Sequence, residues 1–437
     1  MLVSIFVCIG GFVCLLWILR HYSVSLGLPV AYLLNLLLIH VPGAVAHILD
    51  RNRILPGKEY TSVGILFTAI GTVCFVAGVL LVHFRAKAPI PTPAPRTSYW
   101  KFCLLAGWIS TAGAFVINIP SISAVIMKGG AIWMLGIMLA LQSSLRRGDP
   151  RMAWRWLATL AVYPVLMLLV GGFLSYGILA VTVVLAILAV HVRSTPRVIV
   201  GSVLSVVVGI SLFLSYFEHR KEIRAAVWGG ASADARIEAS LGAVRDASVF
   251  DPQNPAHLKA LDARLNQNYF AGLAAARIAT GKVDYLHGQS LWEGFLSLVP
   301  RALWPDKPVV AGSGNIVSEM TGLTLAKGTS FGVGNVMEFQ INFGITGILV
   351  GFLVFGLFLG WLDRRAAETD LTGDLGNTFL YFLPAVAAIQ PNGSVVEIVS
   401  GAASALAAGF AWRWAWHRWL SRSMHLGRIV THVSEAS

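Results

Sequence analysis

Long apolar runs separated by short polar connections fill most of the chain, on both sides of one longer polar segment. Runs long enough to cross a bilayer fall near residues 2–19, 24–42, 62–83, 100–118, 121–141, 155–170, 174–192, 197–216, 344–361, 376–390 and 395–412. The run from Trp156 to Val192 is continuous, and we divide it at Gly171-Gly172 and Ser175-Tyr176-Gly177, which are typical of a tight turn. This pattern predicts an all-α polytopic membrane protein with about eleven (ten to twelve) transmembrane helices.

The longer polar segment divides the chain into three parts. Residues 1–216 form a block of about eight predicted helices, residues 217–343 a large loop, and residues 344–437 about three helices followed by a basic tail. The Pro-rich connection at 87–95 favours an extended spacer. No convincing internal repeat is found, which counts against transporters built from paired halves.

Composition supports the membrane class, because 56% of residues are hydrophobic and only 12% are charged. All four cysteines lie inside predicted helices (Cys8, Cys14, Cys74 and Cys103), so we expect neither a disulfide framework nor a cysteine metal site. The segment from Met1 to Leu19 lacks a basic n-region and a small-residue cleavage site, which predicts a retained helix and no removed signal peptide.

The net charge of +12 is carried by short connections and not by the large loop, in which basic and acidic residues are equal in number. Connections rich in Arg and Lys (85–101, 146–155, 193–197, 364–365 and the tail) alternate with connections that have almost none, such as 118–120 and 391–394. This positive-inside pattern predicts a cytoplasmic tail, an outer N-terminus and an outer 217–343 loop. Only Arg51, Arg53 and Lys58 depart from it. A neutral loop also argues against a nucleic-acid partner.

The first half of the large loop predicts a helix that begins with Asn254 as N-cap and Pro255 at the first helical position. We expect this helix to run to about Ala279 and to stop near Gly281. Its apolar stripe has three-to-four spacing and ends at Arg277, which therefore faces protein or membrane; the stripe comprises Leu258, Leu261, Leu265, Tyr269 and Leu273. An ion pair with Asp262 or Asp284 is the alternative role for Arg277.

Two further segments of the loop have distinct compositions. Residues 290–298 are amphipathic, which is typical of a helix at the membrane interface. Residues 311–334 are rich in Gly, Ser and Thr and predict a mobile lid over a substrate site.

A candidate anion site lies between these segments, in Leu298-Val-Pro-Arg-Ala-Leu-Trp-Pro-Asp-Lys-Pro308. Three prolines fix the backbone and exclude a helix or a central strand. Arg301 and Lys307 on such a shaped surface suit a phosphate or diphosphate, which Arg holds with two donors and Lys as a point charge. The alternative is that both residues extend toward lipid headgroups.

Three other ionisable residues are candidates. Glu338 lies about six residues before an apolar run, where low dielectric favours its use as a general base; a helix-terminal acid is the alternative. His287, in Asp284-Tyr-Leu-His-Gly-Gln-Ser290, is the rival base, although a lone His is more often structural. Lys128 is the one charge inside the predicted span at 121–141, so it is a functional candidate that could also reach the outer surface.

Several catalytic patterns are absent from the sequence: the Asp-x-Asp of metal-dependent sugar-nucleotide enzymes, a Walker loop, a His/Glu zinc pair and Gly-x-Ser-x-Gly. We therefore expect no metal and no cofactor. An enzyme at the outer face also has no nucleotide donors available, so its substrate would already be activated and lipid-linked.

Residues 260–360 carry motifs that resemble those of a known family. The string Val299-Pro-Arg-Ala-Leu-Trp-Pro-Asp-Lys-Pro308, the upstream turn at 287–290 and the string Glu338-Phe-Gln-Ile-Asn-Phe-Gly344 are similar to those of the bacterial O-antigen and exopolysaccharide repeat-unit polymerases of the Wzy type. The first eight predicted helices match this family by number alone. The resemblance implies a GT-C-like fold in the bacterial inner membrane, with the large loop in the periplasm.

The resemblance also implies an inverting, metal-independent glycosyl transfer between two undecaprenyl-diphosphate-linked oligosaccharides, a donor and an acceptor. Arg301, Lys307 and Arg277, with Lys128 as a further candidate, would neutralise the leaving diphosphate. Glu338, or alternatively His287, would deprotonate the acceptor hydroxyl. Trp304, Asp306 and Asn342 would contact the substrate, and a chain-length-regulating membrane protein would be a partner. Charge neutralisation of the leaving group should dominate the catalysis.

Three alternatives stay open at this point. An O-antigen ligase would transfer the glycan to lipid A-core by similar chemistry and would favour His287 as the base. A lipid-linked oligosaccharide flippase would need polar groups along the membrane helices, where Lys128 stands almost alone. A non-catalytic assembly scaffold would tolerate loss of Arg301 and Glu338.

Overall fold

The computed structural model describes residues 1–84, 96–117, 120–171, 175–191, 209–211, 213–223, 225–226, 233–245, 250–299, 304, 306–307, 313–324 and 332–435. Within these residues the protein is all-α, as predicted, and no strand occurs. The helices are α1 (Leu2–Tyr22), α2 (Leu28–Leu49), α3 (Lys58–Phe84), α4 (Arg96–Val116), α5 (Pro120–Gly129), α6 (Ile132–Arg146), α7 (Pro150–Gly171), α8 (Ser175–His191), α10 (Ala233–Arg245), α11 (Pro255–Arg264), α12 (Gln267–Ala279), α13 (Gln289–Leu296), α14 (Gly314–Thr321), α15 (Asn335–Leu371), α16 (Leu375–Ala388) and α17 (Val395–Glu435).

Six helices in the described part of the chain are long and apolar enough to cross a membrane: Leu2–Tyr22, Leu28–Leu49, Lys58–Phe84, Ile122–Leu145, Asn335–Leu371 and Val395–Arg418. Two shorter apolar helices, Gly177–His191 and Leu375–Ala388, accompany them. These helices support a membrane protein, whereas the predicted number of eleven spans stays a prediction. The span expected at 121–141 is bent at Gly130 and Ala131, between α5 and α6.

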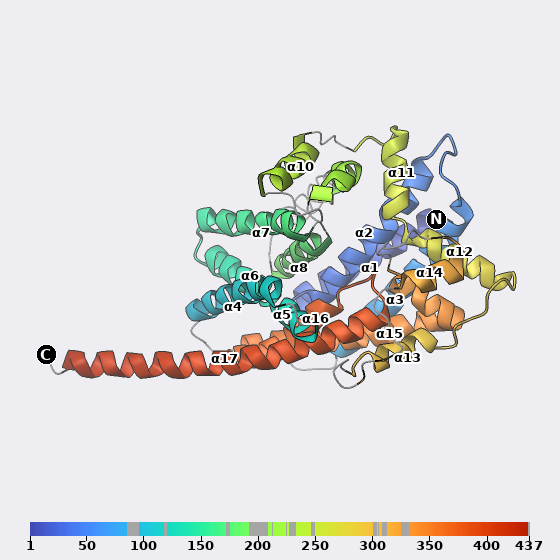
Figure 1. Cartoon of the computed structure of the whole chain (residues 1–437). Helices are drawn as coiled ribbons and strands as arrows, with labels where there is room; N and C mark the ends of the chain where they lie inside the picture. The colour runs from blue at the N-terminus through green and yellow to red at the C-terminus, as the bar shows by residue number, and fades with distance from the viewer. Residues whose placement is uncertain are drawn as a thin grey trace.

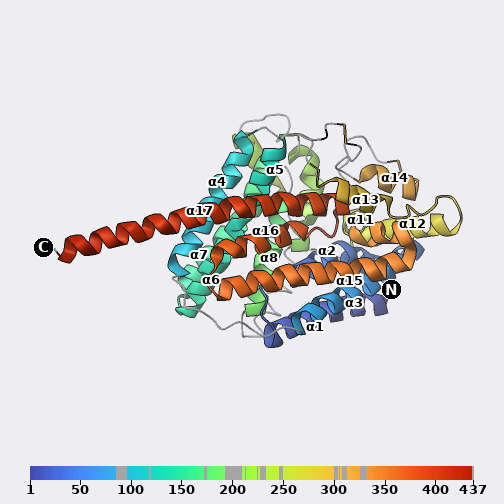
Figure 2. The same ribbon diagram turned by 90° about the horizontal axis from the view of Figure 1, so that it is seen from below.

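Helices α1, α3 and α15 pack side by side, and α16 packs along α17, whose carboxyl-terminal half extends beyond the other helices (Figures 1 and 2). The α3–α15 contact is close because glycines face one another across it. A Cβ atom on Gly78 would lie 2.3 Å from the Leu353 carbonyl oxygen, and one on Gly356 would lie 2.3 Å from that of Phe75. Such small residues let helix backbones approach within a membrane.

We expect Gly356→Ala to destabilise the protein by about 1–3 kcal/mol, because the added methyl group must push α3 away from α15. The measurement is thermal unfolding in detergent. Gly10→Ala on α1 is the matched control, since no atom lies within 4 Å of the corresponding Cβ position. Equal unfolding temperatures for the two variants would contradict the close contact.

One end of the bundle is joined by the buried carboxylate of Asp363 on α15. It accepts hydrogen bonds from the Ser25 hydroxyl (2.6 Å) and from the amides of Leu26 (3.1 Å) and Leu28 (3.0 Å), and so caps the start of α2. The His83 ring on α3 lies 3.6 Å from the same carboxylate. These contacts bring the α1–α2 connection, the end of α3 and the late part of α15 to one end of the molecule.

The opposite end carries helices α11 and α12 of the 217–343 loop, which pack on α2 and α3, whereas α13 packs on α17 and α10 on α7. The predicted N-cap is confirmed, because the Asn254 side chain accepts a hydrogen bond from the Ala256 amide at 2.9 Å. The prediction of one helix from Pro255 to Ala279 is wrong, since the chain breaks at Leu265 and Asn266 between α11 and α12. Because of this break, residues of α12 no longer continue the faces of α11.

Beyond this break, the predicted apolar stripe no longer describes the buried face. The residues of α12 that are buried are Asn268, Ala271, Gly272 and Ala274, while Tyr269 and Leu273 are half-buried. Small residues at these positions allow α12 to approach α3 closely, which the stripe of large apolar residues did not indicate.

The lid prediction for 311–334 is wrong in part, because Gly314–Thr321 form helix α14 with Val317 and Met320 buried in the main core. The boundary predicted between loop and span at 343–344 coincides with a kink in α15. There Phe343 has φ −142° and Gly344 has φ 60° and ψ −141°, which are not helical values. Glu338 therefore lies on a short helical segment that precedes the kink.

Candidate functional site

Glu338 lies in the first turn of α15, and its side chain is 0% exposed. Its Oε2 atom accepts a hydrogen bond of 2.7 Å from the amide of Val395, the first residue of α17. Its Oε1 atom is buried and accepts no hydrogen bond from any described residue. A buried carboxylate oxygen without a partner is costly, which makes this atom a candidate for contact with a substrate.

Asn342, one turn further along α15, holds the turn at 285–290 against this helix. Its Oδ1 accepts from the Gly288 amide (2.9 Å), and its Nδ2 donates to the Ser290 hydroxyl (2.8 Å) and to the Glu338 carbonyl (2.7 Å). The Ser290 side chain in turn lies beside the Glu338 carboxyl group. Asn342 is 0% exposed and its amide is fully engaged, so its role is to position the turn.

We expect Asn342→Ala to loosen the turn at 285–290 on α15, at a local cost of about 1–3 kcal/mol for the two lost hydrogen bonds that join them. The free energy of local opening measured by hydrogen exchange at the Gly288 amide should fall by roughly the same amount, so that this amide exchanges faster. Gln289→Ala changes an exposed residue of the same turn and is the control. Unchanged protection of Gly288 would contradict this assignment.

The start of α17 adds further polar groups next to Glu338. Ser394 and Glu397 form a capping box, in which Glu397 Oε2 accepts from the Ser394 amide (3.0 Å) and Ser394 Oγ accepts from the Glu397 amide (3.3 Å). Lys128 of α5 reaches the same helix, with its Nζ 3.5 Å from the Cβ position of Gly401. Glu338 and Lys128 thus both flank the first two turns of α17.

The segment at 298–308 is only partly described. Arg301 lies outside the described residues. Lys307 is half-buried and its Nζ donates to the carbonyls of Val299 (2.9 Å) and Ser297 (3.2 Å), where it stabilises the carboxyl end of α13. Trp304 and Asp306 are exposed. Ser297 Oγ also donates to the Val396 carbonyl (3.5 Å), so the end of α13 that Lys307 stabilises and the Glu338 carboxylate both contact the first turn of α17.

Arg277 is placed differently, against the carboxyl end of α14. A Cβ atom on Gly322, the residue that ends this helix with φ 69°, would lie 2.5 Å from Arg277 Nη1. A cation at this position is favoured by the helix dipole. Its Nε is buried without a hydrogen-bond partner among the described residues, and no ion pair to Asp262 or Asp284 is found among them.

His287 is exposed and adopts φ 47°, a left-handed conformation that is uncommon for a residue other than glycine. Gly288 follows with φ 90°. The two residues form the tight part of the turn that Asn342 holds, so the structure brings His287 into the same region as Glu338 without a hydrogen bond between them among the described contacts.

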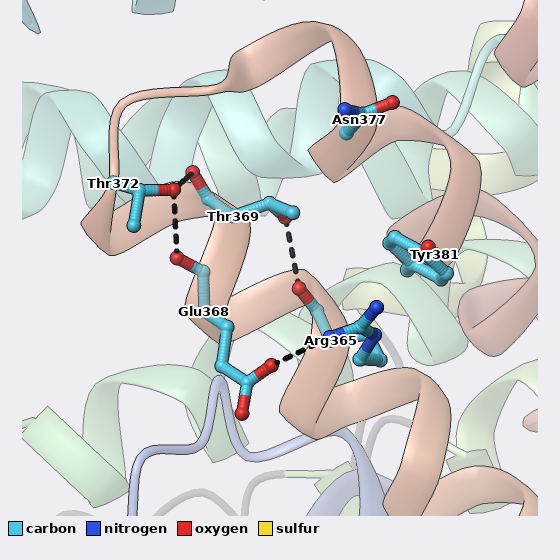
Figure 3. A pocket seen from close by; sticks show the side chains of 6 residues that line it. All are labelled: Arg365, Glu368, Thr369, Thr372, Asn377 and Tyr381. Carbon is cyan, nitrogen blue, oxygen red and sulfur yellow. Dashed lines mark hydrogen bonds and ion pairs between the residues drawn. The ribbon is translucent and has the colours of Figure 1, made fainter. Parts of the chain in front are cut away.

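A separate pocket lies at the other end of α15 (Figure 3), lined by Arg365, Glu368, Thr369, Thr372, Asn377 and Tyr381. Arg365 pairs with Glu368 at 3.2 Å, and the hydroxyls of Thr369 and Thr372 bond to main-chain carbonyls. At about 1.5 Å per residue, roughly 35 Å of helix separates the kink from this pocket. It contains none of the candidate residues identified from the sequence.

Sequence reasoning missed Ser290, Glu397 and the Val395 amide. The pattern Ser394-x-x-Glu397 before an apolar run is a capping-box signature that could have located the start of α17 and its free amides. No sequence signal indicated that this helix end meets Glu338. Among the described residues, no group of three or more His, Cys, Asp or Glu side chains could hold a metal ion.

A family model described as "Domain of unknown function (DUF8712)" matches residues 59–382, which include α3 without its first residue, α4 to α15 and the first part of α16. No curated protein and no solved structure matches the chain.

Proposed function

The chain belongs to the DUF8712 family, and we propose that this member polymerises undecaprenyl-diphosphate-linked oligosaccharide repeat units into O-antigen or exopolysaccharide. The observation that carries the proposal is Glu338, a buried carboxylate whose Oε1 accepts no hydrogen bond among the described residues. Its partner Val395 adjoins Val396, which Ser297 contacts next to Lys307 of the segment at 298–308. The Pro-Arg-x-x-Trp-Pro-x-Lys-Pro motif of that segment supports it further.

In this mechanism, Glu338 Oε1 takes the proton of the acceptor sugar hydroxyl. The hydroxyl oxygen then forms a bond to the anomeric carbon of the donor, while the bond from this carbon to the diphosphate oxygen breaks, with inversion. The released undecaprenyl diphosphate carries the additional negative charge, which Arg301 and Lys307 neutralise, with Arg277 and Lys128 as further cations. Fixed positive groups lower the barrier because they need no reorganisation during the reaction.

The proposal includes the finer topology. About eleven spans with a GT-C-like arrangement would lie in the bacterial inner membrane, with the large loop periplasmic and the tail cytoplasmic. Both substrates would remain anchored in the bilayer, and their diphosphates would meet the loop at the membrane surface. A chain-length-regulating membrane protein would act as partner.

The test is the lipid-linked glycan profile of a deletion strain complemented with wild type, Arg301→Ala or Lys282→Ala, with membrane levels matched. Lys282 is an exposed cation of the same loop and serves as the control. We expect Arg301→Ala to accumulate single repeat units on the carrier, whereas Lys282→Ala makes polymer of normal length. Normal polymer with Arg301→Ala would refute the diphosphate assignment.

Complete loss of the protein separates the alternative functions. Long polymer that forms in the deletion strain but never reaches lipid A-core would identify a ligase. In that case His287, which is exposed in the turn at 285–290, would be the base to test next. Repeat units that accumulate on the cytoplasmic side of the membrane would instead identify a transporter.

A further inference from the structure

Helix α13 belongs to the polar loop, yet one face of it is strongly apolar and uncovered by the described residues. Trp292 is 61% exposed and Phe295 is 64% exposed, and Leu298 follows them just after the helix. Residues 292 and 295 share a face, because residues three apart lie together on a helix. Gln289 and Glu293 occupy the neighbouring edge, where Gln289 Nε2 donates to Glu293 Oε1 at 3.3 Å.

The opposite face of α13 is fixed to the membrane helices. Ser290 and Gly294 are buried, and a Cβ on Gly294 would lie 2.8 Å from Val395 Cγ1 of α17. Ser290 is bonded to Asn342 of α15. These contacts restrict rotation of α13 about its axis, so Trp292 and Phe295 point outward.

The exposed face of α13 is continuous with the kink of α15. A Cβ on Gly288, the N-cap of α13, would lie 2.9 Å from Phe343 Cζ, and Phe343 is itself 47% exposed. We define the aromatic ledge as Trp292, Phe295, Leu298 and Phe343.

Beyond the kink, α15 exposes a row of apolar side chains, of which Leu349 and Val350 are adjacent and the others follow at three or four residues: Ile345, Leu349, Val350, Val354, Phe358 and Trp361. On a helix long and apolar enough to cross a membrane, we expect such a stripe to face hydrocarbon. The aromatic ledge begins where the stripe ends.

We propose that the aromatic ledge is a bilayer-contacting surface, and that α13 lies flat in the membrane interface with Trp292 and Phe295 among the acyl chains. A polar edge beside an apolar aromatic face is the arrangement of an interfacial helix, and Trp favours this depth. The kink at Phe343 and Gly344 then marks the level at which hydrocarbon ends. This inference does not depend on the proposed function.

The test uses single cysteines carrying a nitroxide spin label, in the full-length protein in lipid nanodiscs. Labels at positions 292 and 295 probe the ledge, Leu349→Cys is the lipid-facing reference on α15, and Lys282→Cys, at an exposed cation outside α13, is the water-facing control. The background carries Cys14→Ser, because Cys14 is the exposed native thiol while Cys8 and Cys103 are buried. Spin counting of the unsubstituted background corrects for the half-buried Cys74.

Oxygen concentrates in the bilayer, whereas a nickel chelate stays in water. We expect labels at 292 and 295, like the reference label at 349, to collide more often with oxygen than with the chelate. The label at 282 should show the reverse preference. A preference for the nickel chelate at 292 and 295 would overturn the proposal, because the ledge would then face water. Low collision rates with both reagents would overturn it as well, since a protein surface would cover the ledge.

Discussion

Glu338→Gln is expected to lower the rate of polymer formation by roughly 10²–10⁴-fold, the usual contribution of a positioned general base. Glutamine has almost the same shape and keeps an oxygen that can accept the hydrogen bond from the Val395 amide. It cannot take a proton from the acceptor sugar. The measurement is the rate at which purified protein in proteoliposomes extends lipid-linked repeat units.

The matched control is Glu319→Gln, which removes an exposed carboxylate from α14 in the same loop. Its rate should equal that of wild type. Because Glu338 is buried, the unfolding temperature of Glu338→Gln must also be compared with that of wild type, so that loss of fold is distinguished from loss of chemistry. A well-folded Glu338→Gln protein with an undiminished rate would exclude this carboxylate as the base and direct attention to His287.

Much of the architecture followed from the sequence because long apolar runs have few structural solutions in a membrane. The helices that correspond to the runs at 2–19, 62–83 and 376–390 lie close to their predicted bounds, and the predicted boundary at 343–344 marks the kink of α15. The local N-terminal signal of Asn254-Pro255 was also sufficient, since capping depends only on neighbouring residues.

The errors arose where long-range packing overrode a local pattern. Helix α12 buries Ala271, Gly272 and Ala274 in place of the larger residues of the predicted stripe, because close approach to α3 decides which face is hidden. Helix α14 forms in a segment rich in Gly and Ser because Val317 and Met320 are buried in the hydrophobic core when the helix forms. Neither outcome can be inferred from periodicity within one segment.

The candidate site divides in the same way. Residue types and motif spacing identified Glu338, Lys307 and Lys128, but the groups that surround them come from helices distant in sequence. The Val395 amide on Glu338 is 57 residues away, and the close approach of Lys128 to Gly401 joins α5 to α17. Asn342 was predicted to contact substrate, whereas its buried amide holds the turn at 285–290.

The contact of α11 and α12, from the large loop, with α2 and α3 gives the second large expected effect. A Cβ atom on Gly64 of α3 would lie 2.0 Å from the carbonyl oxygen of Asn268, and one on Gly272 of α12 would lie 1.9 Å from that of Tyr60. Because both clashes are with main-chain atoms, a side chain cannot move aside to relieve them. The contact therefore requires glycine on both helices.

Hydrogen bonds at the same contact involve Asn268, which is 0% exposed. Its Nδ2 donates to the His40 carbonyl (2.6 Å), and its Oδ1 lies 2.7 Å from His40 Nδ1 and 3.1 Å from the Thr68 hydroxyl. Removing this amide would leave several buried polar groups without partners, which costs about 1–3 kcal/mol for each.

We expect Gly64→Val to separate α12 from α3 and to destabilise the protein by more than about 4 kcal/mol, the range reached when main chain must move in a packed core. Thermal unfolding and protease cleavage within residues 250–282 measure the two effects. Gly10→Val places the same side chain on α1 in open space and is the control. Asn268→Ala should increase cleavage in the same segment with less loss of stability, because it removes hydrogen bonds without adding a clash. If Gly64→Val has the same unfolding temperature and the same cleavage rate as Gly10→Val, the loop does not depend on the contact between α12 and α3. The position of Glu338 relative to the loop must then be fixed by α13 and α17 alone.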